Sequence, residues 1–547
     1  MLNKGGVLVI GLDGATFDLL HPLMSSGIMP NLANLMKIGA SGALQSTIPP
    51  VTGPAWASFQ TGTHPGKHGL VDFLRRQPAT YKSALIDSTA LQGQTLWMEL
   101  AKYGRRICVL NVPLTYPPQQ VNGCMISGFL TPGSDASFTY PPELREQLLA
   151  HIPTYTITPS SDILMMGVKK FVQSMLCAVH QKWEAAKWLM EQDHWDLFMV
   201  HFQATDLLQH ALWDYLDPTD PNFDKHSSSE RDLVQRFYRD LDCIIGDLTQ
   251  MAGDAAIIIM SDHGFGSARK RVYLNRWLAN HGYLALNASE SWIRLQEGLE
   301  NLLRGLDVLN LRRRLLPRDF QRQRGRMIRR LTQDPWIDWA RTRAFVFSGS
   351  TFGNLYLNLE GRDPLGVVPE SEYDQLRTEI TECFRALNDP DTGQPVVDCV
   401  YKREDVFAGP KLTELPDLIV RPHGGYLLET RFKGDNLFGP LPQGITGLHR
   451  MNGIYIFSGG PFIAHPEASV TASIVDLAPT ILYLLRVPIP DWMDGRILKE
   501  MMDSNLQPSE ESGAKEPFDA APIVAAPGYS TMEETQILDR LRGLGYV

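Results

Sequence analysis

Carboxylate and imidazole side chains follow several short apolar runs of this 547-residue sequence. Asp13 comes directly after the first run, and Asp206 and His210 follow a later run at a spacing that places both on one face of a helical turn. Asp262 and His263 are adjacent after a further run, in a segment whose glycines let the backbone bend away from them. Because carboxylate and imidazole ligands together suit zinc or manganese, these positions indicate a metal site.

Another position of this kind is His449, just before the apolar run Ile454–Phe457. Each position alone also has a structural explanation: Asp13 as a turn or cap residue, Asp206 as a helix cap and His210 as incidental. The sequence holds 14 His, so one or two near strand ends mean little. Acidic and imidazole positions that follow several separate strands favour the metal site.

The segment Pro49–Ser58 supplies a candidate nucleophile. Its pattern predicts an extended stretch that turns into a helix, with Pro54 near the first helical position, where a missing N–H costs nothing. Thr52 would lie at or just before the helix N-terminus, either as an ordinary N-cap or as a hydroxyl that binds a metal ion and loses its proton. In the second case the helix dipole and free N–H groups would stabilise the alkoxide and a bound phosphate.

The hydrophobic pattern of the sequence indicates which strands and helices position these residues. Short continuous apolar runs are typical of strands buried on both faces of a sheet, and five are found: Val7–Leu12, Ile107–Val112, Leu197–Phe202, Ala255–Met260 and Ile454–Phe457. Helical patterns such as Val168–Met190 lie between them. This alternation predicts an α/β fold, a mixed or parallel sheet with helices on both faces. Ligands gather at the carboxyl ends of such strands, so the polar residues that follow the runs should converge.

Residues 286–343 depart from the alternation, and we expect them to form a helical insertion on one rim of the core, whose two parts are residues 1–285 and 344–502. Ten Arg lie between Arg304 and Arg330. This charge is either a solvated helical face or a cap that attracts anions or a membrane surface.

The end of the chain has two parts. Residues 503–529 are rich in Pro, Ser, Ala and Glu, as a flexible linker is. Residues 530–547 predict a helix with one apolar stripe, formed by Ile537, Leu538, Leu541 and Leu544. We expect this helix to dock onto the body or onto a partner chain, which would make a homo-oligomer.

Composition narrows the class of protein. The chain is 44% hydrophobic and 20% charged, and its net charge of −10 gives no global attraction to a nucleic acid polymer. Its six Cys form no CxxC pair and are expected to be buried in a reducing compartment. The first apolar run is too short for a signal peptide, and no stretch approaches the ~20 apolar residues that span a bilayer. We therefore expect a cytoplasmic protein without a transmembrane segment.

Taken together and in this order, the residues resemble the alkaline phosphatase superfamily. The resemblance is greatest to its type I phosphodiesterase/nucleotide pyrophosphatase branch, which includes bacterial predicted phosphohydrolases and phosphomutases. The segment Thr61–Gly69 looks like that branch's Thr-Gly-x-x-Pro-x-x-His-Gly stretch, and the resemblance covers roughly residues 5–285 and 344–500. It implies an alkaline-phosphatase-like core with a central mixed sheet.

The resemblance also implies a site with two metal ions. One ion would be held by a carboxylate and two imidazoles: Asp206, His210 and His449. The other would be held by two carboxylates, one imidazole and a hydroxyl: Asp13, Asp262, His263 and Thr52. Thr52 would attack phosphorus to form a phosphothreonine, which water would then hydrolyse. His68 matches a family position outside the metal set and is expected to be structural.

Differences from the motifs of related enzymes narrow the range of possible substrates. Sulfatases of the superfamily use a Cys or Ser followed by Pro and Arg, whereas Thr52 and Trp56 stand at the nucleophile and arginine positions here. Nucleotide pyrophosphatases place an Asn near the nucleophile, where this chain has Ala55 and Trp56. No Arg follows Thr52 closely to hold the dianionic end of a monoester, which favours diesters.

We therefore predict a metal-dependent phosphoric ester hydrolase that acts on a small phosphate ester, a phosphodiesterase with two divalent ions. Zinc is the expected metal, with manganese as the alternative. Two other functions fit the same residues. A phosphomutase of the phosphoglycerate mutase kind would use the arginine-rich insertion as an anion clamp, and a non-catalytic binding protein would retain only the fold.

Overall fold

The computed structural model describes most of the chain. The residues outside its description are 92–93, 161–163, 165, 288–335, 350, 433–435, 465–470, 504–528 and 544–547. Most of the arginine-rich insertion and of the linker, together with Leu544, therefore lies outside the described residues.

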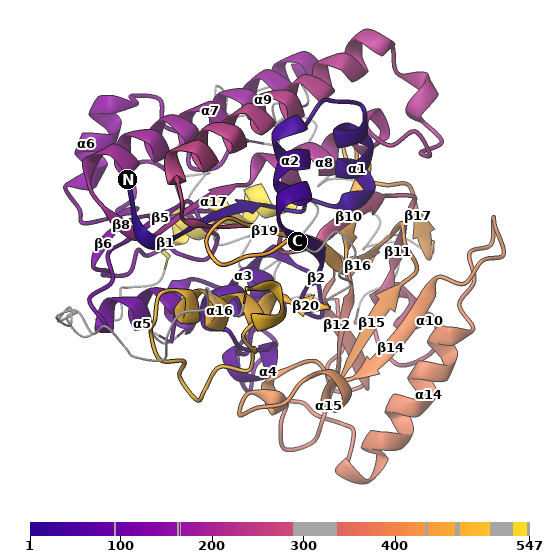
Figure 1. Cartoon of the computed structure of the whole chain (residues 1–547). Coiled ribbons are helices and arrows are strands. Elements are labelled where there is room, and N and C mark those ends of the chain that lie inside the picture. The colour runs from indigo at the N-terminus through magenta and orange to yellow at the C-terminus, as the bar shows by residue number, and fades with distance from the viewer. Residues whose placement is uncertain are drawn as a thin grey trace, which may run out of the picture.

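A nine-stranded sheet forms the centre of the molecule, in the order β20-β2-β19-β9-β1-β8-β5-β6-β7 (Figure 1). The strands are β1 (Leu2–Leu12), β2 (Ala40–Gln45), β5 (Ile107–Leu110), β6 (Gly123–Ile126), β7 (Thr139–Tyr140), β8 (Trp195–Phe202), β9 (Ala256–Met260), β19 (Asn452–Ser458) and β20 (Ala472–Ser473). Strands β9, β1, β8, β5 and β6 run parallel, and β19 is antiparallel to both of its neighbours. The five predicted strands are all present, which confirms a mixed sheet.

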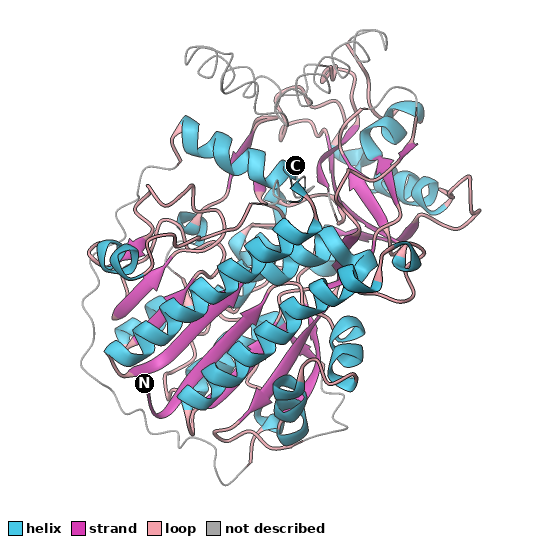
Figure 2. Ribbon diagram, turned by 90° about the horizontal axis from the view of Figure 1, so that it is seen from above, coloured by secondary structure: helices cyan, strands magenta, loops and turns pink. Residues whose placement is uncertain are grey.

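Helices cover both faces of this sheet. One face carries α1 (Phe17–Ser25), α2 (Pro30–Ile38), α7 (Val168–Gln192) and α9 (Ser228–Ala252), and the other carries α3 (Thr52–Thr61), α5 (Leu96–Lys102) and α16 (Leu477–Leu484). Successive residues of a strand point to opposite faces, so Leu8 and Ile10 of β1 pack in the first layer while Val7 and Val9 pack in the second. Figure 2 shows the long helices lying over the sheet, and the predicted α/β fold is confirmed.

Smaller sheets adjoin the carboxyl edge of the central sheet. Strands β12 (Ala344–Gly349), β13 (Gly353–Leu357), β15 (Leu418–Pro422) and β14 (Val397–Lys402) form one sheet, and β16 (Tyr426–Glu429), β11 (Lys270–Tyr273) and β17 (Phe438–Gly439) form another. Together with α10 (Leu274–Asn280) and α14 (Tyr373–Arg385) they enclose a separate hydrophobic core. A two-stranded ribbon, β10 (Gly264–Ser267) with β18 (Gly447–Arg450), lies between these sheets and the central one.

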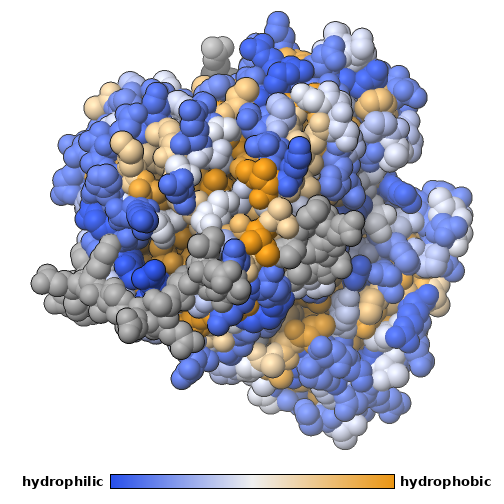
Figure 3. Space-filling view, in the orientation of Figure 1, coloured by the Kyte–Doolittle hydropathy of each residue, from blue (hydrophilic) through white to orange (hydrophobic). Residues whose placement is uncertain are grey.

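The remaining strands and α-helices before the C-terminal helix are short. They are β3 (Leu74–Arg76), β4 (Ser83–Leu85), α4 (Pro65–His68), α6 (Leu144–His151), α8 (Ala204–Leu212) and α15 (Arg403–Val406). None of the helices in the described part of the chain is both long enough and apolar enough to cross a membrane. The face in Figure 3 is mostly hydrophilic, with smaller apolar patches.

The C-terminal helix α17 (Thr531–Gly543) packs against the body of its own chain. Ile537 and Leu541 are fully buried in the core layer that contains α7 and α9. Just before the helix, the Tyr529 hydroxyl donates a hydrogen bond to the Leu130 carbonyl at 3.1 Å. The described part of the apolar stripe, Ile537, Leu538 and Leu541, is therefore covered within the chain itself.

Candidate active site

Three neighbouring parallel strands deliver acidic and imidazole side chains to one edge of the central sheet. Strand β1 ends at Leu12, directly before Asp13, and Leu12 pairs with Phe202 at the end of β8. Strand β9 ends one residue before Ser261, which precedes Asp262 and His263. The carboxyl ends of parallel strands meet at one edge, so these side chains lie together as predicted.

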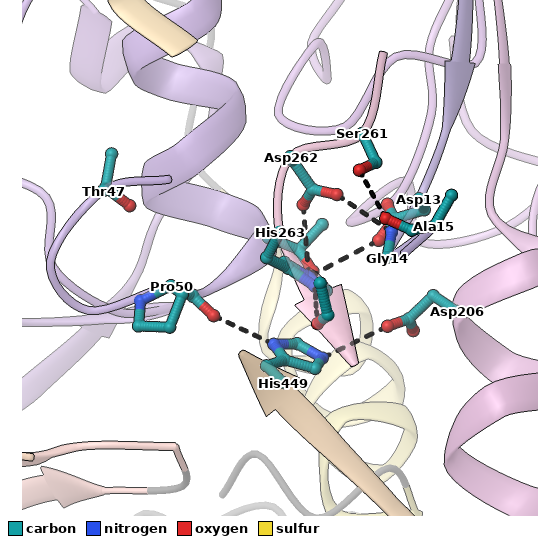
Figure 4. Close-up of polar contacts among 12 residues, drawn as sticks. Asp13, Gly14, Ala15, Thr47, Pro50, Asp206, Ser261, Asp262, His263 and His449 are labelled. Carbon is teal, nitrogen blue, oxygen red and sulfur yellow. Dashed lines mark hydrogen bonds and ion pairs between the residues drawn. The ribbon is translucent and has the colours of Figure 1, made fainter. Parts of the chain in front are cut away.

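Residues far apart in the sequence complete the cluster. Asp206 lies in the first turn of α8, and His210 lies one turn later on the same helix. His449 lies on β18, where it pairs with Phe265 of β10, the strand that directly follows His263. The imidazole of His449 also makes a 3.0 Å contact from Nδ1 to the Pro50 carbonyl, which ties the ribbon to the segment before α3 (Figure 4).

The first predicted ligand set is assembled within hydrogen-bond distances. His449 Nε2 lies 3.2 Å from Asp206 Oδ1 and 2.9 Å from His210 Nε2. His210 Nε2 lies 3.4 Å from the same Asp206 oxygen. One carboxylate oxygen and two imidazole nitrogens therefore face one small volume.

The second predicted set converges on Nε2 of His263. This atom lies 3.2 Å from Asp262 Oδ2, 3.6 Å from Asp13 Oδ1 and 3.2 Å from the hydroxyl oxygen of Thr52. The rings of His263 and His449 stack with centroids 3.5 Å apart, so the two sets lie side by side. The structure thus brings all seven predicted residues together in one buried site.

Thr52 is the first residue of α3, and its side chain does not cap the helix. The N-cap is Val51, which makes no side-chain cap. The hydroxyl of Thr52, in a residue that is 1% exposed, instead faces His263. Its position at a helix N-terminus would stabilise negative charge on the oxygen and on a bound phosphate.

The three imidazoles present unprotonated nitrogens to the site. Nδ1 of His210, His263 and His449 contacts the carbonyl oxygens of Gly447, Gly264 and Pro50, at 3.0, 3.2 and 3.0 Å. A carbonyl oxygen only accepts, so each Nδ1 carries the proton and each Nε2 of a neutral ring is a bare lone pair. Burial favours the neutral ring, because it lowers the pKa of His210 to about 4 and that of His449 to about 3.

In this tautomer the Nε2 lone pairs of His210 and His449 face one another. His210 Nε2 and His449 Nε2 are 2.9 Å apart with no proton between them, an arrangement that a shared cation would stabilise. One oxygen of each carboxylate, Asp13 Oδ1, Asp206 Oδ2 and Asp262 Oδ2, is buried without a hydrogen-bond partner among the described residues. Buried acceptors of this kind are costly unless a cation compensates them, so these residues fit divalent metal ions.

The carboxyl groups of the site also need nearby positive charge if they are to be ionised. Burial raises the pKa of Asp206 to about 6 and that of Asp262 to about 8. Burial, followed by the nearby charges of Asp262 and Asp206, raises the pKa of Asp13 well above its usual range. Three carboxylates cannot all be ionised in so small a buried volume without cations nearby.

The sequence reasoning missed His201, which lies inside β8. Its Nε2 lies 2.9 Å from Asp13 Oδ2, and its Nδ1 lies 3.0 Å from the carbonyl oxygen of Asn111. The ring therefore orients one of the predicted metal ligands. The sequence signal that could have revealed His201 is a polar residue within the otherwise apolar run of β8.

His68 lies outside both ligand sets. Its Nε2 contacts the Ser58 hydroxyl at 3.0 Å, and its Nδ1 accepts the Leu70 N–H at 3.2 Å. Both ring nitrogens are used in linking α3 to the following turn, which agrees with the expected structural role.

Comparison with known proteins identifies the fold and the family. Phosphonoacetate hydrolase from Sinorhizobium meliloti 1021, in complex with phosphonoformate, matches with a TM-score of 0.55 and 16% identity, over 88% of this chain and 95% of that chain. Human ectonucleotide pyrophosphatase/phosphodiesterase 5 matches with a TM-score of 0.50 and 15% identity, over 91% of this chain and 100% of that chain. At these identities the likeness concerns the fold, which is that of the alkaline phosphatase superfamily.

The family match includes every residue of the site. The family described as type I phosphodiesterase/nucleotide pyrophosphatase matches residues 7–453, a range that contains Thr52 and both ligand sets. The chain belongs to the type I phosphodiesterase/nucleotide pyrophosphatase family of phosphoester hydrolases.

Proposed function

We propose that the chain is a metal-dependent phosphodiesterase that works through a phosphothreonine at Thr52. The observation that carries this proposal is the convergence of His210 Nε2, His449 Nε2 and Asp206 Oδ1 within 3.4 Å of one another, close to a buried threonine hydroxyl. Such a cluster suits cations, and a hydroxyl at its edge suits attack on phosphorus.

Each of the two ligand sets would hold one metal ion. Asp206, His210 and His449 would hold the first ion; Asp13, Asp262, His263 and the Thr52 oxygen would hold the second. Bound cations would lower the pKa of the Thr52 hydroxyl and neutralise charge on the phosphoryl oxygens. The high share of imidazole favours zinc, with manganese as the alternative.

The reaction of the chain's own residues has two steps. The Thr52 oxygen attacks phosphorus in line with the leaving group, a new P–O bond forms and the ester P–O bond breaks, and the alcohol leaves with a proton. Water then attacks the phosphothreonine, so that Thr52 regains its proton and a phosphomonoester is released. During both steps the backbone carbonyls of Gly447, Gly264 and Pro50 hold the imidazoles in one tautomer.

The substrate preference rests on the surroundings of Thr52. Helix α3 continues with Ala55 and Trp56, both fully buried, so no cationic side chain from this helix reaches the phosphoryl group. A diester carries one negative charge fewer than a monoester and needs less compensation. We propose a small diester as substrate, and a cytoplasmic location for the enzyme.

The test compares turnover of bis-p-nitrophenyl phosphate and p-nitrophenyl phosphate by zinc- or manganese-loaded protein. Thr52→Ala is expected to lower kcat on the diester on the order of a thousandfold, while Thr52→Ser keeps a measurable part. Thr61→Ala is the matched control, because Thr61 lies on the same helix with its hydroxyl bonded to the Ala57 carbonyl. Metal-dependent turnover that survives in Thr52→Ala would refute the proposed nucleophile.

Metal content gives an independent measurement. Two ions per chain are expected in the purified protein, and removal by a chelator should abolish turnover until the metal is restored. One ion or none per active chain would contradict the two-metal site. Conversion of one phosphoglycerate isomer into the other, faster than its hydrolysis, would instead support the phosphomutase alternative.

A further inference from the structure

A small cavity adjoins the ribbon strand that carries His449, and His449 itself is one of its lining residues. Its volume is about 180 Å³, and we call it the Arg450 pocket. Its lining includes Phe352, Arg421, His423, Gly424, Tyr426 and Arg450. His449 therefore borders both the metal-ligand cluster and this pocket, and Arg450, the next residue of the strand, also lines the pocket.

The guanidinium of Arg450 is partly buried without a carboxylate partner. Its two hydrogen bonds go to backbone carbonyls, those of His449 at 3.0 Å and Ser267 at 2.8 Å. Across the described ranges its guanidinium makes no ion pair with a carboxylate, although the charge of Asp18 acts on it from a greater distance.

The other charges nearby already have partners. Arg421 Nε lies 2.9 Å from Asp398 Oδ2, in the same pocket. A second, adjoining cavity shares His423 and Gly424 with the first, and there Lys270 Nζ holds Asp389 at 2.7 Å. Lys270 also holds Asp391 at 2.5 Å. The carboxylates around the two cavities are thus taken up by neighbours, and Arg450 and exposed Arg269 remain unpaired within the described residues.

Glycines make room for the two unpaired guanidinium groups. A Cβ on Gly266 would lie 2.8 Å from Arg450 Nε, and a Cβ on Gly424 would lie 3.3 Å from Arg450 Nη2. A Cβ on Gly425, whose φ is +102°, would lie 2.7 Å from Arg269 Cγ. Side chains at these positions would displace the arginines, so the backbone is shaped to present the positive charge.

We propose that the Arg450 pocket binds a second anionic group of the substrate, a carboxylate or phosphate carried on the organic part of the ester. This inference rests on the proposed phosphodiesterase function. A partly buried, unpaired guanidinium binds an anion more strongly than an exposed one does. The walls formed by Phe352 and Tyr426 suit the carbon skeleton that joins this group to phosphorus, so an organic anion fits better than free inorganic phosphate.

The test uses a matched pair of substrates, phenyl p-nitrophenyl phosphate and its para-carboxyphenyl analogue, with the metal-loaded enzyme. The wild type is expected to prefer the carboxylated diester by about tenfold in kcat/KM, mainly through a lower KM. Arg450→Gln should bring this preference close to one, and Arg450→Lys should keep part of it. Equal kcat/KM values for the two diesters in the wild type would overturn the proposal.

Control variants separate the pocket from general effects of charge. Arg343→Gln removes an arginine that already pairs with Glu372 at 3.1 Å, and it should keep the full preference. Arg421→Gln leaves the carboxylate of Asp398 unpaired in the pocket, so it should lower the preference for the carboxylated diester. Because Arg421 lies on β15 and not on the strand of His449, this variant changes the pocket without changing the strand that carries the metal ligand. Loss of the preference in Arg343→Gln, or its persistence in both Arg450→Gln and Arg421→Gln, would overturn the proposal.

Binding measured without turnover keeps this test independent of the proposed function. In Thr52→Ala protein, calorimetry should show about tenfold tighter binding of the carboxylated diester, and Arg450→Gln in that background should remove the difference. If neither diester is hydrolysed by the wild type, the proposed function fails while this comparison still decides about the pocket. Phosphate or benzoate binding that depends on Arg450, together with equal binding of the two diesters, would assign the pocket to a free anion and overturn the proposal.

Discussion

Nε2 of His201 lies 2.9 Å from Oδ2 of Asp13, with both side chains completely buried beneath the predicted metal site. The other ring nitrogen of His201 lies 3.0 Å from the Asn111 carbonyl, which only accepts a hydrogen bond. The imidazole therefore donates to Asn111, and its contact with Asp13 requires one further proton shared between the two groups. The pair fixes the orientation of Asp13 within its ligand set.

His201→Ala is expected to weaken metal binding about 10- to 100-fold, because Asp13 loses the partner that orients it. The measurement is the metal dissociation constant, obtained by competition with a chromogenic chelator. His180→Ala is the control, since the His180 side chain is 58% exposed on α7. Unchanged metal affinity in His201→Ala would show that the ring does not position the ligand.

Lys182 gives the unfolding free energy a defined dependence on pH. It is 2% exposed in α7, and burial lowers its pKa to about 7, although the charge of Asp13 acts in the opposite direction. Between pH 7 and its unfolded value of 10.5, the unfolded chain binds a proton that the folded chain has released. The unfavourable contribution of Lys182 to the free energy of folding therefore has its full size below pH 7, and it decreases to zero as pH rises toward 10.5.

Lys182→Met is expected to be more stable than the wild type at pH 7, and this advantage should shrink by up to about 1.4 kcal/mol per pH unit as pH rises. Urea denaturation at several pH values between 7 and 9.5 measures the difference. Lys187→Met, at an exposed position of the same helix, should show no such trend. An advantage that stays constant or grows with pH contradicts the lowered pKa.

The C-terminal helix contributes to the stability of the body through Ile537, which is fully buried. Ile537→Ala is expected to lower the free energy of unfolding by about 2 to 4 kcal/mol, because it leaves a cavity beside the core. Met532→Ala, at a position that is 71% exposed on the same helix, should change it by less than about 0.5 kcal/mol. Equal effects of the two variants would mean that α17 is not docked in solution, and sedimentation of the wild type would then test the homo-oligomer expected from the sequence.

Much of the site could be predicted because its ligands follow buried strands. Asp13 comes directly after a continuous apolar run, and Asp262 is separated from another only by Ser261. Parallel strands end at one edge, so the convergence of the two carboxylates follows from the sheet itself. Thr52 could be placed at a helix N-terminus from Pro54 alone. The family resemblance, carried by ordered motifs, then supplied the ligand sets.

Other features depend on pairing between distant segments. His449 reaches the site because β18 pairs with β10, a strand far away in the sequence, and no local pattern encodes this contact. His201 lies within strand β8, and the role proposed for Arg450 depends on its contacts with other segments, which include Gly266 of β10 and Gly424. The arginine-rich insertion, the metal identity and the cellular location stay predictions.

The steric course at phosphorus tests the phosphothreonine mechanism. A p-nitrophenyl phosphorothioate diester of known configuration, hydrolysed in isotopically labelled water, yields a product whose configuration can be assigned. Attack by Thr52 followed by attack of water inverts phosphorus twice, so net retention is predicted. Net inversion would mean that water attacks the substrate in a single displacement, and it would contradict Thr52 as the nucleophile.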